Sequence, residues 1–345
     1  MSPRVLGARA GDVEDDDFDE FDRASGYSRP RTKTRPDYSA ARQGRVLGVD
    51  RGRFQVALSD GANRAEPLLV HAIKARPLGR KSVVVGDLVR LTGDLSGAPD
   101  ALARIVEVLP RTSLLRRSAD DADPVERPLV ANVDQLLIVT AAADPAPSFG
   151  MIDRLIVAGE AAAIAPLIVV TKTDLASPDA IAAAYDDLDV PVVATRRGAD
   201  LAGIRALLRG HRTVLVGHSG VGKSTLINAL VPGAARATGQ VNDVTGKGRH
   251  TSASAIALPL PDPDSWVIDT PGVRAFGLSG VSAAAVVAAF PDIAALAEDC
   301  PRGCPHLAGS PECALAAAAD NGRLSPSRLA SLQRILAALA ARPEW

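Results

Sequence analysis

The chain has 345 residues, a length that corresponds to roughly two or three domains. Hydrophobic residues make up 47% of it and charged residues 23%, which is ordinary for a globular protein with a sizeable core. The formal net charge of -1 excludes a chain that is basic throughout, so any surface for nucleic acid must be local.

The N-terminus does not resemble a secretory signal, because no basic flank leads into an apolar run. The longest apolar stretch, LIVAGEAAAIAPLIVV, is interrupted by Glu160 and Pro166 and is too short to span a membrane. We therefore expect a cytoplasmic protein with no membrane partner.

Residues 1–43 differ in composition from the rest of the chain. GDVEDDDFDE is acidic, SRPRTKTRPDYSAAR is basic and contains proline, and neither has a hydrophobic period. Such segments bury too little apolar surface to fold, so we predict a disordered tail. It is either simply solvated or, through its basic half, a contact for RNA phosphates.

Residues 44–112 contain short runs rich in β-branched residues, separated by Gly, Asp, Asn and Pro. The runs are GRVLGVD, RFQVALSD, LLVHAI, VVVGDLVRL and ARIVEVL. Five such strands predict a small β-barrel of the oligonucleotide-binding (OB) type. Basic residues lie in or beside the predicted turns, where such barrels hold RNA, and ordinary charged turns give the same pattern. These residues are Arg51, Arg53, Lys74, Arg76, Arg80 and Lys81.

From residue 113 to residue 279 the pattern alternates between strands and helices. The predicted strands are DQLLIVTA, PLIVVTKTDL, PVVATR, RTVLVG and SWVID; the predicted helices are MIDRLIVAGEAAAI, DAIAAAYDDL, LAGIRALL and STLINAL. This rhythm is typical of a doubly wound α/β domain with a parallel sheet.

A phosphate-binding loop follows the strand RTVLVG. GHSGVGKS at 217–224 matches the pattern GxxxxGKS, and a predicted helix continues from it, as the motif requires. Glycines let backbone N–H groups turn toward phosphates, Lys223 places a charge on the β and γ oxygens, and Ser224 offers a hydroxyl to Mg²⁺. The helix adds its positive end. The predicted phosphate-site residues are Gly217, His218, Ser219, Gly220, Val221, Gly222, Lys223, Ser224 and Thr225.

A second motif favours guanine, whereas the phosphate loop alone would also suit an ATPase. In TKTDL, Thr171, Lys172 and Thr173 lead to Asp174 at a strand end. The carboxylate of Asp174 can accept hydrogen bonds from the N1–H and N2 amino groups of guanine, a donor pair that adenine lacks. The aliphatic stem of Lys172 can pack over the base.

A third motif, DTPG, follows the strand SWVID. It is expected to place Asp269 near Mg²⁺ and the backbone amide of Gly272 near the γ-phosphate. DTPG alone is a weak signal, but together with the other two motifs it predicts a GTPase.

The three motifs occur in an unusual order. An ordinary GTPase begins with the phosphate loop and ends with the base-reading motif, whereas TKTD comes first here. This order is that of a GTPase sheet whose old termini are joined and which is cut between its DTPG half and its base-reading half. The fold survives such a cut because adjacent elements still pack together.

With a barrel before it and a cysteine cluster after it, this order resembles the circularly permuted ribosome small-subunit-dependent GTPase family, called RsgA or YjeQ. ANVDQLLIV, IDR and GRHTS also match, and the resemblance covers about residues 44–320. It implies GTP hydrolysis that is stimulated by the small ribosomal subunit, assists late maturation of that subunit and is coupled to release. The implied cofactors are GTP or GDP, Mg²⁺ and one Zn²⁺, and the implied partners are the small subunit and its rRNA. We expect a monomer.

The chain departs from the family at two places in the base site. The family's base-reading motif usually starts with Asn, whose amide tethers neighbouring loops, whereas this chain has Thr171 with a shorter hydroxyl. Guanine choice should persist through Asp174. The loop behind the guanine base usually contains a Ser-Ala pair in the family, whereas this chain has ATRR at 194–197 in the corresponding place. We assign no roles to these residues.

The catalytic residues are predicted from the phosphate loop and the first switch. Many GTPases use a Gln after the DxxG glycine to orient the attacking water, but this chain has Val273. The resemblance places GRHT at the first switch, where Thr251 is a candidate Mg²⁺ ligand and His250 a candidate for orienting water. Alternatively, His250 contacts RNA or lies on a mobile loop. The predicted catalytic residues are His250, Lys223 and Thr251.

All 3 cysteines of the chain lie in DCPRGCPHLAGSPECAL. Cys300, Cys304, His306 and Cys313 offer three thiolates and one imidazole, which suit tetrahedral Zn²⁺, and a cytosolic chain favours metal over disulfides. The alternative is a group of buried thiols. Four protein ligands leave no open position, so the zinc is expected to be structural. The segment resembles the family's zinc-binding domain, with one residue fewer between the first two cysteines, and we predict a helical zinc-binding domain at 280–345.

Two other function classes remain open. One is a nucleotide-gated RNA-binding protein that acts on another RNA with incidental hydrolysis. The other is a metal-delivery GTPase, which would need an exchangeable metal site with a less complete ligand set.

Overall fold

The structure is a computed structural model. Most of the predicted tail lies outside the described part of the chain. The described residues are 37–50, 52–58, 68–79, 82–118, 126–188, 190–231, 255–270, 282–288 and 290–340.

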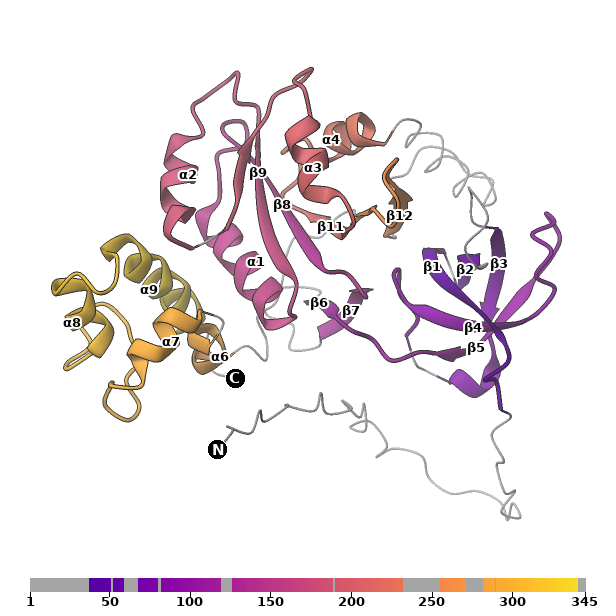
Figure 1. Ribbon diagram of the computed structural model, residues 1–345, viewed down its shortest axis with the longest axis horizontal. Helices are drawn as coiled ribbons and strands as arrows, with labels where there is room; N and C mark the ends of the chain where they lie inside the picture. The colour runs from indigo at the N-terminus through magenta and orange to yellow at the C-terminus, as the bar shows by residue number, and fades with distance from the viewer. Residues whose placement is uncertain are drawn as a thin grey trace, which may run out of the picture. The chain divides into compact units, whose positions relative to one another are not determined.

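The first five strands form a closed barrel (Figure 1). Strand β1 pairs with β2 and β4, β2 pairs with β3, and β5 joins β3 to β4, so the ring closes and leaves no free edge. The prediction of an OB-type barrel is therefore confirmed. The strands are β1 (Arg42–Asp50), β2 (Arg53–Leu58), β3 (Leu69–Lys74), β4 (Leu88–Gly93) and β5 (Ala103–Val108), with the short 3-10 helix η1 (Arg76–Leu78) after β3.

One predicted barrel strand is half loop. Only the second half of VVVGDLVRL forms β4, because the buried carboxylate of Asp87 accepts a hydrogen bond from the Val84 N–H (2.8 Å) and closes a turn. Arg111 donates from Nε to the same carboxylate (2.7 Å), so its charge is paired. The sequence pattern predicted a strand here because Val83, Val84 and Val85 are buried like strand residues. They precede β4, however, and are not part of a strand.

Beyond the barrel strands, the same sheet continues through six strands in the order β10-β9-β8-β11-β13-β12. All neighbours among these six are parallel except β12 and β13. The pairing Gly48↔Ile256 joins them to β1 of the barrel. The strands are β8 (Gln135–Ala141), β9 (Ala165–Thr171), β10 (Val192–Ala194), β11 (Arg212–Val216), β12 (Ile256–Pro259) and β13 (Trp266–Asp269).

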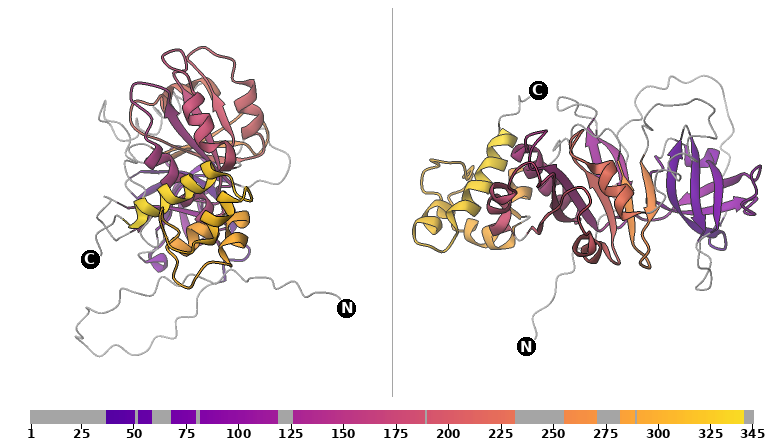
Figure 2. Two further views of the ribbon diagram at one scale, coloured as in Figure 1. Left: turned by 90° about the vertical axis from the view of Figure 1, so that its left-hand side faces the viewer. Right: turned by 90° about the horizontal axis from the view of Figure 1, so that it is seen from above.

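Helices cover both faces of this sheet, as the alternating pattern predicts (Figure 2). Alternate residues of each central strand point to opposite faces, so Leu136 and Ile138 of β8 belong to one core cluster and Leu137 and Val139 to the other. The first cluster includes residues of α1 and α2, and the second includes residues of α3 and α4. The helices are α1 (Phe149–Ala161), α2 (Asp179–Tyr185), which continues into the 3-10 helix η2 (Asp186–Leu188), α3 (Ala202–Leu208) and α4 (Lys223–Leu230).

Three details differ from the predicted pattern. A two-stranded sheet of β6 (Leu114–Ser118) and β7 (Glu126–Ala131) precedes β8, and β12 was not expected. Helix α1 ends at residue 161 rather than 164, because Ala163 has a φ of 54° and the Ile164 N–H donates to the Gly159 carbonyl.

The last described segment is helical; its helix α9 lies against α1 and α2, and α6 lies against α1 (Figure 1). Asp153 of α1, which is buried, accepts hydrogen bonds from Arg334 of α9 and from the Tyr185 hydroxyl of α2 (2.9 Å). Among described residues, every helix is too short or too polar to cross a membrane. The helices of this segment are α6 (Ala283–Ala288), α7 (Pro291–Ala297), α8 (Ala314–Asp320) and α9 (Pro326–Ala340).

Candidate nucleotide site and metal centre

The sequence motifs meet at one edge of the parallel sheet. The phosphate loop follows β11, the TKTD loop follows β9, and Asp269 ends β13, so all of them lie at the carboxyl ends of neighbouring strands. Ligands of open α/β sheets bind at this edge. The pairing Leu215↔Asp269 sets the end of β13 beside the phosphate loop, and the Thr270 hydroxyl donates to the Leu215 carbonyl (2.6 Å).

The phosphate loop requires glycine at its first position. Gly217 has a φ of +153°, and a Cβ there would lie 2.1 Å from the Val139 carbonyl oxygen of the adjacent strand. No side chain fits that gap, so the loop can leave the strand along this path only with glycine. The residues that follow, His218, Ser219 and Gly220, are exposed.

Lys223 lies folded over the phosphate loop. Its Nζ donates to the carbonyls of Gly217 (2.5 Å) and His218 (2.9 Å). Burial lowers the pKa of Lys223, and the charge of Asp269 opposes that shift. Burial likewise raises the pKa of Asp269, with Lys223 opposing. Each ion thus lies in a partly desolvated site where additional opposite charge, such as phosphate for Lys223 or a divalent cation for Asp269, would be favourable.

The TKTD loop is fixed to its neighbours through threonines. The Thr171 hydroxyl lies 2.5 Å from the Val221 carbonyl of the phosphate loop. Thr173 donates from its backbone N–H (3.3 Å) and its hydroxyl (3.1 Å) to the Thr195 carbonyl, in the ATRR segment. Lys172 donates to the Asp144 carbonyl, in the loop after β8. These contacts hold the base-reading loop against the segments on either side of it.

Asp174 is exposed, and no hydrogen bond within the described ranges occupies its carboxylate. It is therefore available to accept donors from a ligand. Ser224 and Thr225 lie in the first turn of helix α4 and are also exposed. His250, Thr251 and Gly272 lie outside the described residues.

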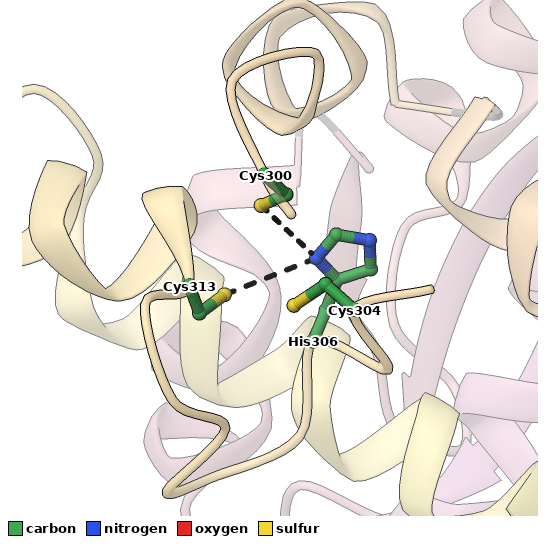
Figure 3. A group of neighbouring side chains, drawn as sticks. All are labelled: Cys300, Cys304, His306 and Cys313. Atoms are coloured by element: carbon green, nitrogen blue, oxygen red, sulfur yellow. Dashed lines mark hydrogen bonds between the residues drawn. The ribbon is translucent and has the colours of Figure 1, made fainter. Parts of the chain in front are cut away.

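Cys300, Cys304, His306 and Cys313 converge in the C-terminal segment (Figure 3). Their four ligand atoms all lie within 4.8 Å of one another. The His306 Nδ1 lies 3.5 Å from the Cys300 Sγ and 3.9 Å from the Cys313 Sγ. Tetrahedral Zn²⁺ with Zn–S of about 2.3 Å and Zn–N of about 2.0 Å places such N and S atoms about 3.6 Å apart. The donor set therefore fits zinc.

The surroundings of the cluster also suit a metal. The Ala314 N–H donates to the Cys300 Sγ (3.2 Å), a contact that supports a thiolate and orients it. Burial lowers the pKa of His306, which favours the neutral, metal-binding imidazole. Burial raises the pKa of Cys304, so its thiolate forms less readily until a cation offsets the charge. The thiols are all free rather than joined in disulfides.

The barrel carries a row of basic residues that the sequence revealed only in part. The pairings Arg53↔Ile73 and Ile73↔Arg104 put the two arginines on β2 and β5, on either side of β3, and both are exposed. Their neighbours Phe54 and Ala103 are buried, so the arginines point outward. Arg104 was missed because it lies within a predicted strand, not in a turn. Of the other predicted basic residues, Lys74 and Arg76 follow at the end of β3, and Arg51, Arg80 and Lys81 lie outside the described ranges.

Comparisons with known proteins agree with this arrangement. The family model for the RsgA GTPase matches residues 108–279. The small ribosomal subunit biogenesis GTPase RsgA of Azotobacter vinelandii is 42% identical over 250 residues, which cover 70% of this chain and 71% of that protein. The protein of the same name from Gemmatimonas aurantiaca is 38% identical over 269 residues, covering 76% and 86%.

Solved structures show the same fold. The crystal structure of YjeQ from Thermotoga maritima superposes with a TM-score of 0.63 at 25% identity, covering 88% of this chain and 99% of that one. The structure of YloQ, a circularly permuted GTPase, superposes with a TM-score of 0.63 at 25% identity, covering 89% and 98%. The permuted motif order and the similarity over most of the chain lead to one conclusion: this chain belongs to the RsgA GTPase family.

Proposed function

We propose that this protein hydrolyses GTP, binds the small ribosomal subunit, assists its late maturation and leaves it on hydrolysis. The observation that carries the proposal is the meeting of three GTPase motifs at one sheet edge, in permuted order. Support comes from relatives named small ribosomal subunit biogenesis GTPase, which match over more than two thirds of their length.

In this proposal the phosphate loop holds the β- and γ-phosphates. Lys223 exchanges its contacts with the loop carbonyls for phosphate oxygens, which are better partners for a desolvated ammonium group. Ser224 and Asp269 support Mg²⁺, and the ion offsets the unfavourable burial of the Asp269 carboxylate. Mg²⁺ would supply the positive charge that phosphoryl transfer needs.

Asp174 reads the guanine base. The exposed carboxylate accepts from N1–H and N2, while Lys172 covers the base with its stem. The complete proposed nucleotide site comprises Thr171, Lys172, Thr173, Asp174, residues 217–225, Asp269 and Gly272.

Exchanging the base-reading carboxylate for an amide tests this assignment. Asp174→Asn should lose affinity for GDP and gain affinity for XDP, because the amide N–H₂ can donate to the xanthine C2 carbonyl. Lys223→Ala should weaken binding of both nucleotides, because it acts on phosphate. GDP binding by Asp174→Asn at the wild-type level, measured by calorimetry, would reject the role of Asp174.

Hydrolysis needs a group that orients water, and we propose His250 for it, with Thr251 as a ligand of Mg²⁺. The support is chemical: Val273 has no polar side-chain atom, and a neutral imidazole can hold a water molecule. Both residues belong to the segment that leads into β12.

Zn²⁺ is proposed as one structural ion at Cys300, Cys304, His306 and Cys313. A complete set of four ligands leaves no site for substrate water, and it argues against metal delivery, which needs an exchangeable site. The exposed row of Arg53 and Arg104 supports a contact of the barrel with rRNA phosphates. We propose that the protein acts as a monomer.

The proposed coupling follows from the permutation. Because DTPG is the last GTPase motif, the chain passes from Asp269 at the γ-phosphate side into helix α6, whose Val286 packs in the core cluster that also includes Cys313. A nucleotide-dependent change after Asp269 would therefore reach the zinc-binding segment within a short length of chain. Hydrogen exchange of residues 282–320 should differ between GDP and a GTP analogue, and equal protection would exclude this coupling.

The alternative, a nucleotide-gated protein for another RNA, makes a different binding prediction. Sedimentation with purified ribosomal subunits should show GTP-analogue-dependent binding to small subunits and little binding to large ones. Equal binding to both subunits in either nucleotide state would favour the alternative.

A further inference from the structure

A hollow of about 560 Å³ lies at the edge of the parallel sheet where its strands begin, opposite the edge that carries the nucleotide motifs. Helices α1 and α3 end there, because each turns through a short connection into the next parallel strand, β9 or β11. None of the lining residues belongs to the proposed nucleotide site. They include the polar Gln135, Glu160 and His211 and the apolar Pro166, Pro191 and Leu207.

The apolar side of the hollow is open to solvent and rigidly held. Leu207, in the last turn of α3, is 37% exposed, and Pro191 is also exposed. The backbone of Leu207 is fixed by the buried Gln135, which donates from Nε2 to the Leu207 carbonyl (3.1 Å) and accepts from the Thr213 hydroxyl (2.8 Å). Exposed apolar side chains on a fixed backbone favour a partner, because binding removes them from water at little cost in ordering.

Glu160 adds a carboxylate that has no partner among the described residues. It lies in the last turn of α1, where the end of the helix carries negative potential. Burial raises the pKa of Glu160, so the ionised carboxylate lacks part of the solvation that it would have in water. A cation in the hollow would relieve both effects.

The basic residues beside the hollow are already paired. The Nδ1 of His211 lies 3.1 Å from the Asp134 carboxylate. Arg212 donates to the same carboxylate from Nε and from its backbone N–H (2.9 Å each). A basic side chain from a partner would therefore meet an unpaired carboxylate at Glu160.

We propose that this hollow is a docking site for a protein of the small ribosomal subunit, and that it receives a basic side chain next to an apolar residue. The inference rests on the proposed function. The ammonium or guanidinium group contacts Glu160, while its aliphatic stem and the apolar neighbour cover Leu207 and Pro191. RNA fits less well, because the Glu160 carboxylate repels phosphates. The nucleotide lies at the opposite edge of the sheet, so both sites can be occupied together.

The test is the affinity for purified small subunits in the presence of a GTP analogue, measured by sedimentation. Glu160→Gln keeps the shape of the side chain and removes its charge. It should weaken binding about 5–10-fold, the effect of losing one charge-assisted hydrogen bond at a partly exposed site. Glu160→Lys should weaken binding further. The matched control is Asp186→Asn, which removes the same charge from an exposed position on η2 and should bind within about twofold of the wild type.

Stability separates a docking role of Glu160 from a structural one. Glu160→Gln replaces an unfavourably buried carboxylate with a neutral amide, so its melting temperature at pH 7 should equal or exceed that of the wild type. Its affinity for GDP should be unchanged. A lower melting temperature would show that Glu160 is paired within the protein, and it would overturn the proposal.

A photo-crosslinking residue at the rim identifies the class of partner. Leu207→p-benzoylphenylalanine, irradiated in complex with small subunits, should form a crosslink to a subunit protein. A crosslink to rRNA alone, or to nothing, would overturn the proposal, and so would unchanged subunit binding by Glu160→Gln and Glu160→Lys. Failure of the proposed function gives a different pattern: the wild-type protein would then bind small and large subunits alike.

Discussion

The contact between Asp153 and Arg334 allows a quantitative prediction about how the C-terminal helices are held. The Asp153 side chain is 2% exposed and accepts from two nitrogens of Arg334, whose side chain is 36% exposed. Arg334→Met removes both donors and leaves a buried carboxylate with only the Tyr185 hydroxyl. Breaking a fully buried pair costs about 3–5 kcal/mol. Because Arg334 is partly solvated, we discount the loss to about 2 kcal/mol.

The assay is native-state hydrogen exchange of the amides of α9, which reports local opening and does not assume two-state unfolding of the whole chain. Arg328→Met, on the same helix, is the matched control, since its partner Asp292 is 50% exposed and can be solvated when the arginine is lost. Asp153→Asn combined with Arg334→Met should recover most of the loss, because no charge remains buried. An effect of Arg334→Met no larger than that of Arg328→Met would refute the reasoning.

Four further predictions concern the metal, the cation site, the barrel and catalysis. Cys304→Ser should lower bound zinc below one per chain and reduce exchange protection of the segment from residue 300 to 320; wild-type protein without zinc by elemental analysis would contradict the assignment. Burial raises the pKa of Asp269, so its ionised form destabilises the nucleotide-free fold as pH rises above the ordinary value of 3.8. Asp269→Asn should therefore raise the nucleotide-free melting temperature at pH 7, by less as the pH falls toward 3.8, while weakening Mg²⁺-dependent turnover; a lower melting temperature at pH 7 would oppose this. Arg104→Glu should weaken small-subunit binding and reduce its salt dependence, and unaltered binding would place the RNA surface elsewhere. His250→Ala should keep GTP binding but lower subunit-stimulated turnover by roughly 10² or more, and near-normal turnover would transfer the role to another group.

The architecture was predictable because the barrel and the parallel sheet differ in hydrophobic period, and because the phosphate-loop motif requires a strand before it and a helix after it. Short β-branched runs indicated the barrel, and the alternation of strands and helices indicated the parallel sheet. The C-terminal end of helix α1 was predicted three residues too late, because the apolar pattern continues through Ala163. The helix ends before that residue, whose φ angle is positive, and the hydrophobic pattern does not report this angle. The valines before Asp87 were mistaken for strand, because a turn closed by a buried carboxylate leaves no signal in the hydrophobic pattern.

The motif residues of the nucleotide and metal sites were recognised from spacing, but the contacts that position them were not. Thr195 and Thr171 become neighbours only through the register of two parallel strands. Asp153 and Arg334 are 181 residues apart in the chain. Such pairs depend on tertiary packing, and a single sequence contains no local pattern that reports it.

Measuring GTP turnover with increasing amounts of purified small ribosomal subunits, and in parallel with large subunits, tests the central claim most directly. If the protein is a GTPase of small-subunit maturation, turnover should rise to a plateau as the concentration of small subunits increases and should not rise with large subunits. Lys223→Ala should abolish this turnover. Turnover that is the same with small subunits, with large subunits and with neither would contradict it.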